Sequence, residues 1–149
     1  MWLASLTFLT LPVQASIVSE DYLDRLAIVE SNNKATAVGR AGELGSFQLK
    51  EAAWTDAVRR MFGRIPQSYA YSRSNCFDPV KSRAVAREHL LWLERTMTKE
   101  GFTPNKISLY MSYNLGMSMS ERYEHNYKHP SLTIERKAIF KRAELIFYP

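Results

Sequence analysis

The sequence predicts an all-α, mainly helical domain. Two observations lead to this fold class. Apolar residues recur at three- and four-residue spacing in successive segments, which is the period of helices that bury one face. No segment alternates between apolar and polar residues for long enough to predict a strand of any length. The chain has 149 residues, of which 46% are hydrophobic, and this favours a single domain with one packed core.

The first helix is expected from residue 20 to residue 30. Ser19 is a typical N-cap, and two acidic residues follow it in the first turn, where the helix dipole favours negative charge. Glu30 lies at the edge of the apolar face of this helix, and the polar run 31–34 ends it. The residues of the apolar face are Tyr22, Leu23, Leu26 and Val29.

Further helices follow along the chain, each with its own start or stop signal. Gly63 is a typical helix end, and Asp78 followed by Pro79 is a typical helix start. The segment 64–77 has no helical period and is expected to be a loop. The expected helices cover residues 47–62, 79–100, 104–116 and 133–146.

Charge and cysteine content exclude several classes of protein. The net charge of +5 favours an acidic partner, which includes nucleic acid, anionic lipid and a carboxylate-bearing polymer. Cys76 is the only cysteine, so a small domain held by disulfides is excluded, as is a zinc site built on cysteine pairs. We interpret Cys76 as an apolar core residue. The three histidines lack metal-ligand spacing, so no metal and no cofactor are expected.

Residues 1–15 are predicted to be an export signal, which leaves 16–149 as the domain. The segment carries no charge and ends in Val13-Gln14-Ala15, a typical cleavage sequence, although the usual basic start is missing. It is shorter than the roughly 20 apolar residues that span a membrane. A buried N-terminal helix is the alternative. The export signal predicts a periplasmic or extracellular protein without a membrane span.

Glu30 is the first candidate for catalysis. A glutamate at the end of an apolar helix loses water, and burial of this kind favours the protonated form by roughly one to two pH units. A carboxyl group that keeps its proton near neutral pH can donate it to the leaving oxygen of a glycosidic bond. The alternative is an ordinary surface acid at a helix terminus.

Short motifs around Glu30 and later in the chain point to one family. Glu30-Ser31 is followed by Ala37-Val38, Gly42 and a turn that continues to Gln48; Asp78-Pro79 comes next, and a Tyr-Asn pair precedes Gly116. In this order and at these separations, they resemble the soluble lytic transglycosylases and goose-type lysozymes, which cut the glycan strands of peptidoglycan. The resemblance covers most of residues 16–149. It implies a lysozyme-like α domain with a very short β-hairpin near the catalytic loop.

The resemblance also implies roles for individual residues. Glu30 would be the single catalytic residue, acting first as acid and then as base, and the product would end in 1,6-anhydro-MurNAc. Gln48 and the backbone at Gly45 would line the sugar cleft, while Tyr113 and Asn114 would position Glu30 and the substrate's N-acetyl group. The substrate-binding set is Ser31, Gly45, Gln48, Tyr113 and Asn114.

Glu43 departs from the family pattern, which has a small apolar residue there. Inverting hydrolases use two carboxylates separated by roughly 6.5 to 9.5 Å, of which the second activates water. Glu43 is therefore a candidate second catalytic carboxylate, and the chain would then be a lysozyme-type hydrolase. If Glu43 points outward or pairs with Arg40, it is only a loop acid.

Two other classes remain as alternatives. The basic pairs Arg136-Lys137 and Lys141-Arg142 would suit a helical domain that binds nucleic acid, although a solvated helix face also explains them. The second alternative is a protein that binds peptidoglycan without cleaving it. The preferred reading is a monomeric enzyme that acts on peptidoglycan and does not bind nucleic acid. Wall turnover, attack on a rival's wall, and partnership with a secretion or conjugation machine all fit it.

Overall fold

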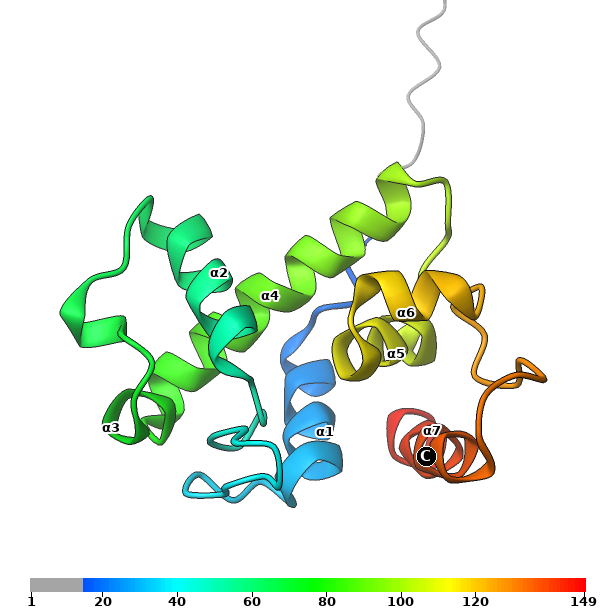
Figure 1. Ribbon diagram of the computed structural model, residues 1–149, viewed down its shortest axis with the longest axis horizontal. Helices are drawn as coiled ribbons and strands as arrows, with labels where there is room; N and C mark the ends of the chain where they lie inside the picture. The colour runs from blue at the N-terminus through cyan, green and yellow to red at the C-terminus, as the bar shows by residue number, and fades with distance from the viewer. Residues whose placement is uncertain (1–14) are drawn as a thin grey trace, which may run out of the picture.

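The computed structural model describes residues 15–149, and the part of the chain that it describes is built from helices (Figure 1). The export signal expected at residues 1–15 lies, except for Ala15, outside the described residues. The all-α prediction is confirmed. The elements are α1 (Glu20–Ser31), α2 (Glu51–Phe62), the 3-10 turn η1 (Gln67–Tyr69), α3 (Arg73–Cys76), α4 (Pro79–Lys99), α5 (Lys106–Leu115), α6 (Met117–Arg122) and α7 (Ile134–Phe147).

The long helix α4 runs diagonally through the molecule and separates two groups of helices (Figure 1). The helices α2 and α3 pack against it on one side, while α5 and α7 pack together on the other, and α1 contacts both α4 and α7. Aromatic rings fill the second group. Tyr22 of α1 stacks on Phe147 of α7 with ring centroids 4.7 Å apart, and Tyr110 of α5 meets the ring of Phe140 at 5.8 Å. These contacts bring α1, α5 and α7 side by side. None of the helices among residues 15–149 is long and apolar enough to cross a membrane.

The helix boundaries agree best with the sequence where a side chain supplies the cap. Ser19 accepts a hydrogen bond from the backbone N–H of Tyr22 at 3.2 Å, and Asp78 accepts from Val80 at 2.9 Å, so α1 and α4 begin as predicted. The helix expected from Pro104 begins later, because Asn105 is its true cap and forms a reciprocal capping box with Ser108.

Other expectations were wrong. Helix α2 starts at Glu51 rather than at residue 47, because Gln48 has a φ of +48° and cannot lie in a right-handed helix. The segment 64–77 is not all loop, since it contains η1 and α3, and the short helix α6 was not predicted. The expected β-hairpin is absent: within the described residues, only two isolated antiparallel bridges form, Val38 with Leu44 and Leu44 with Leu49.

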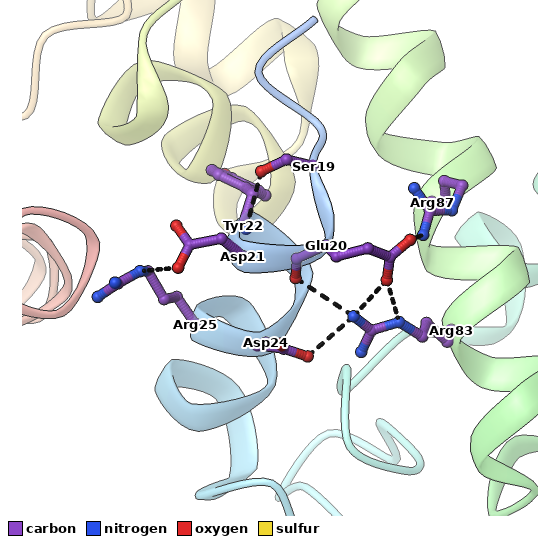
Figure 2. Close-up of polar contacts among 8 residues, drawn as sticks. All are labelled: Ser19, Glu20, Asp21, Tyr22, Asp24, Arg25, Arg83 and Arg87. Atoms are coloured by element: carbon purple, nitrogen blue, oxygen red, sulfur yellow. Dashed lines mark hydrogen bonds and ion pairs between the residues drawn. The ribbon is translucent and has the colours of Figure 1, made fainter.

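An ion cluster holds the start of α1 against α4. In Figure 2, Arg83 and Arg87 project from α4 toward the acidic first turns of α1. Arg83 pairs with Glu20 at 2.6 Å and with Asp24 at 2.8 Å, and Arg87 also pairs with Glu20. The hydrogen bond from Arg83 lowers the pKa of Glu20. The cluster therefore fixes the end of α1 opposite to Glu30.

We expect Arg83→Met to lower the melting temperature only slightly, because the two carboxylates it pairs with are largely exposed and water screens them. The difference from the native protein should shrink further in 0.5 M NaCl. Thermal denaturation at low and high salt measures both effects. Arg64→Met, which removes an exposed cation from the loop after α2, is the charge-matched control. A large loss that salt does not change would contradict an electrostatic role for Arg83.

Candidate active site

Glu30 lies in the last turn of α1, after a run of core residues. Leu26, Ala27 and Val29 are buried, and Glu30 is the next residue toward the helix end. Its oxygen Oε1 is also buried, and it accepts no hydrogen bond from any residue that the structure describes. A buried carboxylate oxygen without a donor is costly when it is charged. The carboxyl group is therefore better accommodated in its protonated form.

The pKa of Glu30 reflects this environment. Burial raises it from its ordinary value to about 7, because the ionised form loses its hydration. The nearby charge of Glu43 raises it further. The Tyr110 hydroxyl, the Asn114 amide and the charge of Arg142 act in the opposite direction and lower it. A carboxyl group with such a pKa still carries its proton in much of the population at neutral pH, as a general acid must.

Helix α5 supplies the side chains that face Glu30. Tyr113 and Asn114 lie three and four residues after Tyr110, so each is a neighbour of Tyr110 on the helix surface. The Asn114 Nδ2 donates to the Tyr110 hydroxyl at 3.5 Å, and the Tyr113 hydroxyl donates to the carbonyl of Phe47 at 2.5 Å. The predicted pair Tyr113 and Asn114 lies beside Glu30, since the Asn114 amide lowers the pKa of Glu30 and the charge of Glu30 raises the pKa of Tyr113. Tyr110 was not predicted as a site residue, although its position one helical turn before Asn114 indicates that the two side chains are neighbours.

The loop after α1 is held by its own residues. The Ser31 hydroxyl donates to the carbonyl of Ser46 at 2.8 Å and ties the end of α1 to the loop. The side chain of Gln48 donates from Nε2 to the Gly45 carbonyl at 2.8 Å, and the Gly45 N–H donates to Ala37 at 2.9 Å. Three residues predicted to bind sugar, Ser31, Gly45 and Gln48, therefore also shape this loop.

Gly45 lies where the loop passes closest to the chain beyond it. Its φ is +78°, and a Cβ placed on it would lie 2.2 Å from the carbonyl oxygen of Cys76. Only glycine fits both conditions. Cys76 itself is buried and unpaired, and burial raises the pKa of its thiol, in agreement with a core residue.

Glu43 is occupied by partners within the loop. Its Oε2 accepts a hydrogen bond from the backbone of Ala41 at 3.0 Å, and its Oε1 pairs with the Lys50 ammonium at 3.5 Å. The partner considered from sequence, Arg40, does not form this pair. The charge of Glu43 also raises the pKa of Glu30, so its carboxylate lies near the candidate acid.

Aromatic residues of the segment before α4 contact the loop and the end of α2. The Tyr71 hydroxyl donates to the Gly42 carbonyl at 2.8 Å, and the ring of Tyr69 packs on Phe62 with centroids 4.8 Å apart. One hollow lies away from Glu30. It has a volume of about 470 Å³ and includes neither Glu30 nor the loop, since its lining includes Phe102, Asn105, His125, Tyr127, Glu144 and Tyr148.

Comparison with known proteins gives one family. The family model described as the transglycosylase SLT domain matches residues 12–133, which is most of the chain and contains Glu30, the loop and α5. Helix α7 begins at Ile134, beyond the matched range. No curated protein matches the chain.

Proposed function

We propose that this chain, which belongs to the SLT transglycosylase domain family, cleaves the β-1,4 bond between MurNAc and GlcNAc. In this proposal Glu30 is the single catalytic residue. The family as a whole acts on the glycan strands of peptidoglycan. The observation that carries the proposal is the buried carboxyl group of Glu30, which has an oxygen without a hydrogen-bond donor and a pKa of about 7.

The proposed reaction uses Glu30 twice. The protonated carboxyl group donates its proton to the glycosidic oxygen as the bond from that oxygen to C1 of MurNAc breaks. The substrate's N-acetyl group stabilises the cationic sugar. The Glu30 carboxylate then takes the proton of the sugar's own 6-hydroxyl, whose oxygen bonds to C1 and closes the 1,6-anhydro ring. No water is consumed, and Glu30 ends the cycle protonated.

The contacts of Glu43 support a single-carboxylate mechanism. Glu43 accepts a hydrogen bond from the Ala41 backbone and pairs with Lys50, and both contacts stabilise its ionised carboxylate within the loop. We assign two roles to Glu43: its contacts stabilise the loop, and its charge raises the pKa of Glu30. We assign Tyr113 and Asn114 to positioning of Glu30 and the N-acetyl group, and Ser31, Gly45 and Gln48 to the sugar-binding wall of the cleft.

The substrate also supports export. Peptidoglycan lies outside the cytoplasmic membrane, so an enzyme acting on it must be exported, in line with the uncharged, apolar start of the chain. We therefore propose a periplasmic or extracellular, monomeric enzyme that opens glycan strands, in wall turnover or beside a secretion or conjugation machine.

Mass spectrometry of fragments released from purified peptidoglycan tests the reaction. We expect anhydro-ended fragments from the native protein and from Glu43→Gln, and none from Glu30→Gln. Reducing ends that require both glutamates would instead establish a two-carboxylate hydrolase. Absence of fragments from every version would leave a protein that binds peptidoglycan without cleaving it.

The rate of cleavage should fall as the pH rises through about 7. Glu30 must be protonated to act as acid, and its pKa in the folded protein is about 7. The basic limb of the profile of kcat/KM against pH reports this pKa. In Glu43→Gln the limb should move to lower pH, because the negative charge that raises the pKa of Glu30 is gone. A limb that stays in place would show that another group controls it.

A further inference from the structure

We propose that Arg136 of α7 is a positioning residue that fixes the orientation of the Asn114 amide beside Glu30. The inference rests on the proposed function, because it assigns Glu30 as the catalytic acid. It adds a residue that lies beyond the family-matched range 12–133, on the helix from which the charge of Arg142 also lowers the pKa of Glu30.

The geometry around Asn114 is directional. The Arg136 guanidinium donates from Nη1 to Oδ1 of Asn114 at 2.9 Å. A guanidinium has only donors, so the oxygen end of the amide must face it. The Nδ2 end is then directed away from Arg136, toward the Tyr110 hydroxyl at 3.5 Å and the side where Glu30 lies.

The orientation of this amide matters for Glu30. The donor end of Asn114 stabilises the ionised carboxylate and lowers its pKa. If the amide rotated by half a turn, an oxygen would face the carboxylate and would disfavour the charged form. Glu30 must be charged when it takes the proton of the 6-hydroxyl, so the donor end serves the second half of the proposed reaction.

The fold holds Arg136 in place for this contact. Its backbone N–H donates to the side chain of Thr133, the N-cap of α7, at 3.3 Å. The rest of α7 is anchored by the buried rings of Phe140 and Phe147. At its far end, Arg25 of α1 donates to the carbonyl of Ile146 at 2.6 Å. The side chain of Arg136 is itself exposed, so it can be replaced without opening the core.

Titration of Glu30 by NMR of ¹³C-labelled glutamate carboxyl groups tests the inference. We expect Arg136→Met to raise the pKa of Glu30 by about half to one pH unit, the equivalent of one ordinary hydrogen bond. Lys141→Met, which removes a cation from the same helix, is the charge-matched control and should leave the pKa within about 0.2 pH units, since Lys141 is solvent-exposed. Resonances are assigned with Glu30→Gln.

A double-mutant cycle separates positioning from direct electrostatics. In the Asn114→Ala background, Arg136→Met should no longer change the pKa of Glu30, because there is no amide left to orient. An equal rise in both backgrounds would show that the cation acts on Glu30 directly and would overturn the inference. No rise in the native background would overturn it as well.

Cleavage assays complete the test. Arg136→Met should lower kcat about 3- to 10-fold, since the variant loses an interaction worth about one hydrogen bond in the reaction. The NMR titration needs no activity. A native protein that fails to cleave peptidoglycan would therefore refute the proposed function while leaving the role of Arg136 open to the same measurement.

Discussion

Glu30→Gln should reduce the release of glycan fragments by about 10³-fold or more. Glutamine has nearly the same shape but can neither donate the acidic proton nor accept one. Positioned acid–base groups contribute roughly 10² to 10⁴ in rate, and in the proposed reaction one residue serves both steps. The release of soluble fragments per enzyme, followed over hours, measures the loss. Residual activity within tenfold of the native rate would show that another group is the acid.

The same variant should be more stable than the native protein above neutral pH. The pKa of Glu30 is raised to about 7 in the folded state, against an ordinary value of 4.5. Between these two values the folded state binds more protons than the unfolded state, so stability falls as the pH rises. The stabilisation that comes from protonated Glu30 is fully present below about pH 4.5 and is lost above about pH 7. Glutamine does not titrate and avoids this loss.

Urea denaturation of both proteins measures this difference. At pH 8 we expect the free energy of unfolding of Glu30→Gln to exceed that of the native protein by about 3 kcal/mol, the free energy of a pKa difference of this size. At pH 4.5 the two proteins should be nearly equal. If the free energy of unfolding of Glu30→Gln exceeds that of the native protein equally at both pH values, burial is not the origin of the raised pKa.

Gly45→Ala should destabilise the protein by about 3 kcal/mol or more. The left-handed backbone costs an alanine about 1–2 kcal/mol. In addition, its Cβ would lie 2.2 Å from the Cys76 carbonyl oxygen, which is backbone at the end of α3 and cannot rotate away. Either α3 or the loop must move. Because the Gly45 carbonyl also accepts from Gln48, the side chain proposed to bind sugar would lose its partner along with the loss of stability.

Gly42→Ala is the matched control for this prediction. Gly42 has a similar φ of +86°, but a Cβ there would meet nothing within 4 Å. It should lose only the backbone cost of about 1–2 kcal/mol. Urea denaturation of the two variants therefore isolates the contact with Cys76. Equal losses would show that the loop yields to the added methyl group without cost.

Local signals were sufficient for part of the fold. Ser19 and Asp78 predicted the starts of α1 and α4, because a cap satisfies backbone N–H groups within a few residues of itself. The late start of α2 was not predictable in this way. Gln48 takes a positive φ where the loop closes on itself, and no pattern in the sequence marks that closure. The resemblance to the family was confirmed by the matched family model.

The grouping of residues around Glu30 was predictable where a motif carries it. The Tyr-Asn pair and Glu30 were singled out from sequence, and the structure brings them together through the packing of α1 near α5. Tyr110 and Arg136 were not predicted to lie near Glu30 and Asn114, because their places depend on how helices cross. Arg136 was read as part of a basic helix face, and only the packing of α7 against α5 brings it to Asn114.

Helix α7 also limits how far the protein can be truncated from its C-terminus. A fragment ending at residue 133 would keep the whole family-matched range yet lack Phe140 and Phe147. The rings of Tyr22 and Tyr110, which now pack on them, would be uncovered. Apolar surface exposed in this way promotes aggregation. The smallest unit expected to remain soluble therefore extends through Phe147, and expression or domain-fusion work should keep that boundary.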